Sequence, residues 1–173
     1  TGSEMKIDEA KKEFIQTWGK LGSEWGINRT MAQVHALLLI SSSALSTEEV
    51  MSGLNVSRGN ANMNLRELVN WQLIKRQLIP GDRKEFFVAE KDIWEVAKRV
   101  ARERKKREIE PLLKELDMLK KVEGDKKSKD IKAFTEMVSS LSDFISQMDK
   151  GVNIMLSADE HWFFGTLLKA IKK

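Results

Sequence analysis

The first part of the chain repeats apolar residues at the spacing of amphipathic helices. Between residues 7 and 25 they recur every three or four positions, which predicts a helix with one apolar stripe. Asn28 is placed as the N-cap of a second helix over 28–40, and its dense apolar content predicts near-complete burial. A third, short helix is predicted over 46–54, with carboxylates in its first turn and Gly53 closing it.

The next forty residues predict a helix-turn-helix followed by a hairpin. Ser57 is placed to cap a fourth helix that ends near residue 71, and a short helix, a turn and a second capped helix form a helix-turn-helix pattern. Residues 73–79 and 85–89 are two β-capable runs joined by a Pro-Gly-Asp turn, which predicts a β-hairpin wing. No other strand pattern is visible, so we expect a mainly α fold with one small β-ribbon.

Helical spacing returns after the hairpin. A helix begins at residue 92 and carries a basic run over 98–107. Pro111 marks either a kink or the first turn of a new helix, because proline lacks the N–H that a helix interior needs. A long helix is predicted from residue 131, with Gly151 well placed to end it, and a short C-terminal helix covers 159–171.

These elements suggest three segments and a dimer. We expect an N-terminal helix (5–27), a winged helix-turn-helix that binds DNA (28–92) and a C-terminal helical region (93–173). The terminal segments carry more apolar surface than one subunit is expected to bury, which normally marks an interface. The predicted dimerisation residues are Phe14, Trp18, Phe134, Leu141, Phe144, Trp162, Phe163 and Leu167.

The fourth helix holds the candidate chemistry. With Leu65 taken as the inward direction, an amide-rich face, including Asn60, Asn64 and Glu67, is predicted to point outward, and asparagine can bond adenine in the major groove. A simpler interpretation remains open, in which Ser57 is only a cap and the asparagines form a neutral, solvated face. The predicted DNA-contacting residues are Ser57, Arg58, Gly59, Asn60, Asn62, Met63 and Asn64, with Arg83 and Lys84 at the wing tip directed at the minor groove.

The same stretch resembles a known family. The runs VSRGNANMNLREL at 56–68, WQLI at 71–74 and GDRKEFF at 81–87 resemble the GbsR branch of the MarR superfamily of winged-helix regulators, and the similarity extends over roughly residues 12–115. The resemblance implies a homodimer whose winged helices bind a pseudo-palindromic operator. Gln72 stands where this family is expected to have glycine, so we expect a differently shaped turn into the wing. Choline-type ligands of some members are not carried over, because no ligand motif can be matched.

The amino-acid composition excludes several other classes of function. The chain has 173 residues, 41% hydrophobic and 32% charged, which is ordinary for a folded protein. It has no cysteine and two histidines, so cysteine chemistry and metal sites are disfavoured, and no enzyme motif is found. No apolar run reaches the roughly 18 residues of a membrane span, and no signal peptide is visible, so we expect a cytoplasmic protein. The net charge of +4 fits a polyanion partner without requiring one.

We therefore expect a homodimeric transcriptional regulator that binds specific sequences in double-stranded DNA. We expect no cofactor and no membrane partner, and the sequence does not indicate whether a small-molecule effector binds. Repression is the more common outcome for such proteins, although no residue decides it. The alternative is a winged-helix module that binds protein, and salt-dependent DNA binding separates the two. The basic run at 98–107 fits either a solvated face or a phosphate-contacting surface. The five tryptophans favour core or dimer packing over a cation–π cage.

Overall fold

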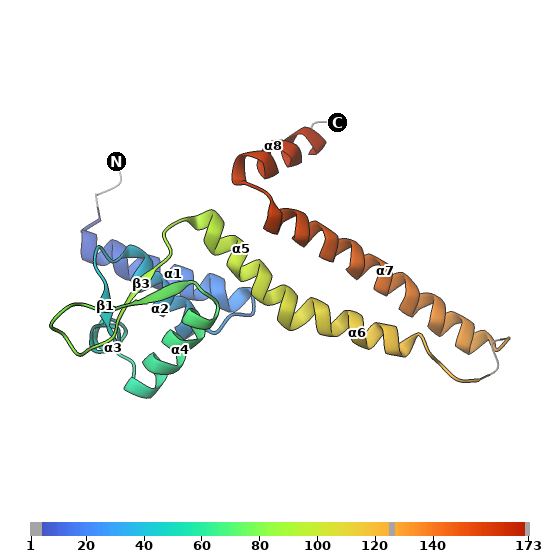
Figure 1. Cartoon of the computed structure of the whole chain (residues 1–173), viewed down its shortest axis with the longest axis horizontal. Coiled ribbons are helices and arrows are strands. Elements are labelled where there is room, and N and C mark those ends of the chain that lie inside the picture. The colour runs from blue at the N-terminus through green and yellow to red at the C-terminus, as the bar shows by residue number, and fades with distance from the viewer. Residues whose placement is uncertain (1–4, 125–126, 172–173) are drawn as a thin grey trace. The chain divides into compact units, whose positions relative to one another are not determined.

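The computed structural model describes residues 5–124 and 127–171, so small parts of the predicted C-terminal region (125–126 and 172–173) lie outside it. The chain divides between Val96 and Ala97 into two compact units, called unit 1 and unit 2 here. The elements (Figure 1) are α1 (Ile7–Glu24), α2 (Arg29–Ile40), β1 (Leu45–Ser46), α3 (Thr47–Leu54), α4 (Arg58–Asn70), β2 (Ile74–Gln77), β3 (Phe86–Ala89), α5 (Ile93–Arg104), a π-helical segment η1 (Lys105–Ile109), α6 (Glu110–Leu119), α7 (Lys129–Ser157) and α8 (Glu160–Ile171).

The helix starts of unit 1 lie at the predicted caps. The side chain of Asn28 accepts a hydrogen bond from the N–H of Met31 at 3.1 Å. Ser46 and Glu49 form a capping box, in which each side chain accepts from the backbone N–H of the other. Ser57 accepts from the third N–H of α4 at 3.3 Å. These side chains satisfy donors that have no partner within the helix, which is why short polar residues begin all three helices.

The end of α3 differs in detail from the prediction. The helix ends at Leu54 as expected, but Gly53 lies inside it and Asn55 is the residue in the left-handed conformation, with a φ of 53°. Asparagine is one of the few residues that adopt this conformation at modest cost. The prediction that Gly53 closes the helix is therefore wrong.

The predicted hairpin is present within a larger sheet. β2 and β3 pair antiparallel, with Ile74 opposite Ala89, and β1 adds to the other side of β3 to give the order β1-β3-β2. The prediction of a mainly α fold with a β-hairpin wing is confirmed, whereas the expectation that no strand lies outside the hairpin is wrong. A strand of two residues has no periodicity to detect, and Leu45 and Ser46 are extended here because the fold brings them against Phe87 and Phe86.

The core of unit 1 is built around α2. Val34 and Leu38 on this helix are buried, as are Leu65 and Leu68 on α4. α1 packs closely on α2, and a Cβ added at Gly22 would lie 2.6 Å from the Cβ of Ala32. The expected burial of the second helix is confirmed, and its packing fixes the position of the helix-turn-helix.

Unit 2 holds the long helices. Pro111 lies in the first turn of α6, directly after the π-helical segment, so the second of the two alternatives for this proline is confirmed. α7 runs through Gly151 to Ser157, so the prediction that Gly151 ends the helix is wrong. A glycine inside a helix costs about 1 kcal/mol, which packing of α7 against α6 and η1 can offset. Among the described residues, no helix is long and apolar enough to cross a bilayer.

Candidate nucleic-acid interface

The exposed face of α4 is rotated from the predicted one. Gly59, Met63, Arg66 and Asn70 are all exposed and follow each other at intervals of four, three and four residues, the spacing of one helix face. Met63 is 59% exposed. We call these four residues the outer stripe. Arg66, which sequence reasoning did not select, lies in its middle.

Asn64, predicted to point outward, is instead buried. It is 3% exposed, and its Nδ2 donates to the backbone oxygen of Asn60 at 2.9 Å and to its Oδ1 at 2.7 Å. Asn62 faces α3, where its Oδ1 accepts a hydrogen bond from the hydroxyl of Thr47 at 3.4 Å. Glu67 is half-buried and accepts from the indole N–H of Trp71 at 2.9 Å.

The rotation has a simple cause. α4 packs against both α2 and α3, so its buried arc is wider than one hydrophobic stripe and includes Asn64 beside Leu65. A helical wheel that takes Leu65 as the centre of the buried side places the asparagines too far outward. The amide-rich face of the sequence is therefore partly a packing surface.

The N-terminus of α4 carries an ion pair. An Nη of Arg58 lies 2.9 Å from a carboxylate oxygen of Glu48 in the first turn of α3, and both side chains are largely exposed. A hydrogen bond from its own backbone N–H lowers the pKa of Glu48, and the hydrogen bond from Arg58 lowers it further. Ser57 and Gly59 are also exposed at this helix start. The sequence showed Glu48 only as a carboxylate favourable in a first helical turn, with no signal for its partner ten residues later.

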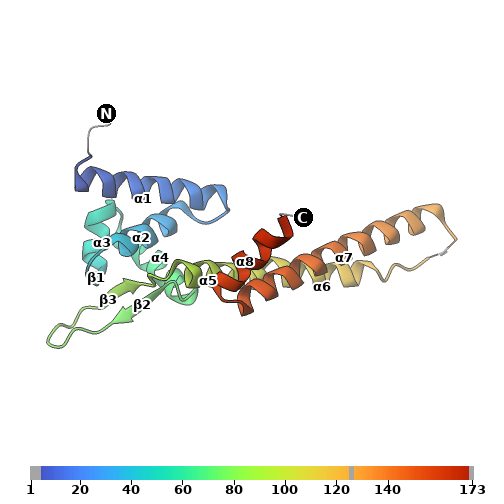
Figure 2. The same ribbon diagram turned by 90° about the horizontal axis from the view of Figure 1, so that it is seen from above.

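The wing tip is ordered by two local interactions. The N–H of Asp82 donates to the carbonyl of Ile79 at 3.1 Å, and Gly81 has a φ of 85° after Pro80, which is a type II turn. The Asp82 carboxylate then accepts from the N–H of Lys84 at 2.9 Å. Figure 2 shows the hairpin reaching beyond the helices of its unit, and the predicted pair Arg83 and Lys84 is exposed at its end.

No family model and no curated protein matches this chain. It is similar to a solved structure described as a transcriptional regulator, with 18% identity and a TM-score of 0.56 over 80% of this chain and 95% of that one. The chain has a winged-helix fold. That structure is described as a regulator and not as an enzyme.

Two further solved structures are more distant. A point mutant of S. aureus MepR bound to an oligodeoxyribonucleotide has 14% identity and a TM-score of 0.41, covering 80% of this chain and 99% of that one. Wild-type MarR from E. coli in its apo form has 15% identity and a TM-score of 0.36, covering 95% and 90%. At these TM-scores neither structure adds to the argument.

The turn into the wing of this winged helix keeps the conformation that glycine favours. Gln72 has a φ of 60°, its N–H donates to the carbonyl of Val69, and the N–H of Leu73 donates to that of Leu68. Glycine adopts this conformation at little cost, and the expectation that the turn differs in shape from that of the GbsR family stays a prediction. The side chain of Gln72 is accommodated in the left-handed region, which carries a conformational cost of about 1 kcal/mol.

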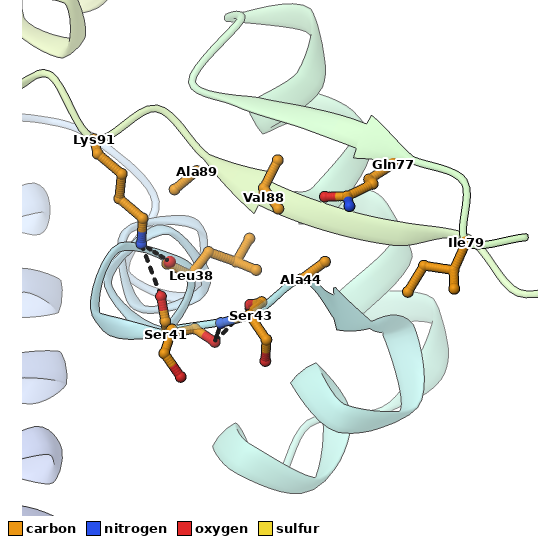
Figure 3. A pocket seen from close by; sticks show the side chains of 10 residues that line it. Leu38, Ser41, Ser43, Ala44, Gln77, Ile79, Val88, Ala89 and Lys91 are labelled. Atoms are coloured by element: carbon orange, nitrogen blue, oxygen red, sulfur yellow. Dashed lines mark hydrogen bonds between the residues drawn. The ribbon is translucent and has the colours of Figure 1, made fainter.

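Behind the wing lies an open pocket of about 400 Å³ between the end of α2, the serine segment 41–43 and the hairpin (Figure 3). Lys91 lies at its edge and donates to the carbonyls of Leu38 at 2.8 Å, Leu39 at 2.5 Å and Ser41 at 3.0 Å. Burial lowers the pKa of this ammonium group. The lysine satisfies carbonyls at the C-terminus of α2, a capping role that the sequence pattern did not indicate.

The predicted dimerisation residues lie on helices of both units and most are exposed. In unit 1, Phe14 stacks on half-buried Trp18 with ring centroids 5.7 Å apart. In unit 2, half-buried Phe163 meets Phe164 edge to face at 5.5 Å. The exposed members of unit 2 are Phe134, Leu141, Phe144, Trp162 and Leu167. The structure thus leaves apolar surface uncovered in each unit.

Ion pairs occupy part of the basic run. Arg104 pairs with Glu108 at 3.1 Å and Arg107 with Glu103 at 2.7 Å, each one helical turn apart. Lys105 pairs with Asp149 of α7. Because these three cations already have acidic partners within the chain, they are less available to phosphates than unpaired ones. Among the residues that the structure describes, no group of three or more histidine, aspartate or glutamate side chains is placed to hold a metal ion.

Proposed function

We propose that this chain is a sequence-specific, DNA-binding transcriptional regulator of the GbsR branch of the MarR superfamily. The observation that carries the proposal is the chemistry of two exposed features of unit 1: α4 exposes Met63 and Arg66, and the wing tip exposes Arg83 and Lys84. Within residues 5–124 and 127–171, neither Arg66 nor the predicted wing residue Arg83 forms an ion pair. Cations without an acidic partner are suited to phosphates and base edges.

The outer stripe suggests which bases are read. A guanidinium can bond O6 and N7 of guanine together, and an apolar side chain such as Met63 can contact the thymine methyl group. Gly59 has no protein atom near its Cβ position, so a phosphate can approach the backbone there beside Ser57. Arg58 can join this contact because its exposed ion pair with Glu48 is weak. This assignment replaces Asn64 with Arg66 as the central reader of the helix.

The active form is proposed to be a homodimer that binds a pseudo-palindromic operator in the cytoplasm. Binding is proposed to repress transcription. Residues 28–92 would bind DNA, and the segments 5–27 and 93–173 would pair the subunits. The exposed aromatic and aliphatic residues of α7 and α8, with Phe14 on α1, support this division, because uncovered apolar patches of this kind normally mark interfaces. A two-fold axis would also set the spacing of half-sites about one helical turn apart.

The DNA proposal is tested by selecting bound fragments from genomic DNA and measuring affinity by fluorescence anisotropy at several salt concentrations. Arg66→Gln should weaken the selected site by about 1 to 3 kcal/mol and random duplex by less. Arg83→Ala should flatten the salt slope, because one counterion-releasing contact is lost. Arg29→Gln is the matched control, since Arg29 bonds Gln16 of α1 and should leave both quantities unchanged. Salt-independent binding would favour the protein-binding alternative.

The dimer is tested by sedimentation of the full chain at micromolar concentration. Phe144 is 61% exposed, so Phe144→Asp should leave the subunit folded and convert the dimer to monomer. Phe144→Leu keeps an apolar side chain and should preserve the dimer. A wild-type monomer, or an aspartate variant that dimerises normally, would refute the proposed interface.

A further inference from the structure

One apolar residue of the wing is highly exposed to solvent. Leu78 follows directly after β2 and is 82% exposed, the largest value among the large hydrophobic side chains that the structure describes. Its neighbour Ile79 is much less exposed and lines the pocket behind the wing with Gln77 (Figure 3). Leucine at such a position contributes little to the core and leaves its apolar side chain available to a partner.

The backbone around Leu78 is held on both sides. Before it, the β2–β3 ladder ends with Gln77 opposite Phe86, and Arg76 lies 3.7 Å from the carboxylate of Glu85 across the hairpin. After it comes the type II turn closed by the N–H of Asp82. The ladder and the closed turn hold the backbone on both sides of Leu78, so less backbone entropy is lost when this residue is bound than in an open loop.

The surroundings of Leu78 are cationic. Residues 75–85 contain four basic side chains, Lys75, Arg76, Arg83 and Lys84, and only two acidic ones. A second copy of the wing would bring the same positive charge against this surface and be repelled. A nucleic-acid duplex offers the complement, because its phosphates flank a groove whose floor presents the edges of stacked bases.

We propose that Leu78 is an apolar wedge that the wing inserts into the minor groove of duplex DNA, partly unstacking a base step and bending the helix. The inference rests on the proposed DNA-binding function and adds to it a mechanical role that the cations alone do not supply. Apolar side chains inserted between base steps kink DNA toward the major groove, and pyrimidine–purine steps such as TA yield most easily. The wing would therefore favour sequences by their deformability at positions without a base contact.

The absence of cysteine from the chain allows a direct test. Leu78→Cys introduces a single thiol for an environment-sensitive fluorophore, and Ile7→Cys, at an exposed site on α1, is the matched control. The probes are two 30-base-pair duplexes, one with a TA-rich centre and one G·C-rich. We expect a blue shift at position 78 with duplex, larger for the TA-rich one, and no shift at position 7.

Affinity and bending provide the second measurement. Leu78→Ala removes atoms of a side chain that is 82% exposed, so the protein should stay folded. It should weaken the TA-rich duplex about tenfold, the loss expected for roughly half burial of the side chain, with an unchanged salt slope because no counterion is released. Energy transfer between dyes at the duplex ends should show less bending, restored by Leu78→Met.

The possible outcomes separate this inference from the proposed function. Duplex binding with no blue shift at position 78 and no loss in the alanine variant would overturn the wedge and leave the DNA proposal standing. A shift produced by anionic phosphatidylserine vesicles or by protein concentration alone, and not by duplex, would also overturn it. Failure of the wild-type chain to bind any duplex would overturn both.

Discussion

His35 on α2 offers a test of the packing of unit 1. The residue is 4% exposed, and its Nε2 atom has no hydrogen-bond partner among the residues that the structure describes. Its ring lies 6.3 Å from that of Trp18 on α1, and Lys91 is the charged group whose field reaches it. Burial, helped by the positive charge of Lys91, lowers the pKa of His35 from 6.5 to about 4. The imidazole is therefore neutral in the folded protein over the whole physiological range.

The size and sign of the effect follow from linkage. The pKa falls by 6.5 − 4, about 2.5 units, when the chain folds, and one unit corresponds to about 1.36 kcal/mol. Below pH 6.5 the unfolded chain binds a proton that the folded chain does not, so unfolding is favoured as pH falls. The stabilisation by neutral His35 is complete above pH 6.5 and decreases down to about pH 4, by about 3 kcal/mol in all.

The perturbation is His35→Leu, which removes the titration and the unpartnered nitrogen. The free energy of unfolding is measured in urea by tryptophan fluorescence between pH 4 and pH 8. Glu48 and Glu49 also have lowered pKa values, so their protonation in acid destabilises the folded protein. This loss is the same in the wild type and in His35→Leu, so the difference between the two free energies of unfolding isolates His35. We expect that difference to be constant above pH 7 and to move by about 3 kcal/mol in favour of the leucine variant by pH 4.

His161→Gln serves as the control, because His161 is an exposed residue of α8 in the other unit, and it should keep the wild-type pH profile. A difference between wild type and His35→Leu that does not change with pH would refute the reasoning. So would a nuclear magnetic resonance titration that places the His35 transition above pH 6, since the ring would then be hydrated and not buried against Trp18.

Three further predictions concern local structure. Ser46→Ala removes one half of the capping box and should lower the free energy of unfolding by about 1 kcal/mol, whereas exposed Ser42→Ala should change it by less than about 0.5 kcal/mol in the same urea titration. Gln72→Gly should be neutral or raise the melting temperature, with a gain of up to about 1 kcal/mol, because its φ of 60° suits glycine; a clear loss would contradict the left-handed turn. Asn64→Ala should cost about 1 to 2 kcal/mol of stability and weaken selected and random DNA alike, whereas a loss confined to the selected site would make Asn64 a base reader.

Much of unit 1 could be predicted from short stretches of sequence. The caps at Asn28, Ser46 and Ser57 act on N–H groups three residues away, so a few neighbouring residues decide where each helix begins. The type II turn at Pro80 and Gly81 is equally local, because one residue presets φ and the next tolerates a positive value. The helix-turn-helix and the wing follow from these signals together with hydrophobic periodicity.

The composition of the candidate interface was decided by the tertiary structure. Which side of α4 faces outward depends on two neighbouring helices, so Asn64 is buried although the wheel of the isolated helix placed it outward, and Arg66 is exposed although the wheel did not single it out. The ion pair of Arg58 with Glu48 and the bonds of Lys91 to the end of α2 join residues ten and about fifty positions apart. Periodicity describes one element at a time, whereas burial and pairing depend on which elements meet, and that is set by the packing of the whole unit.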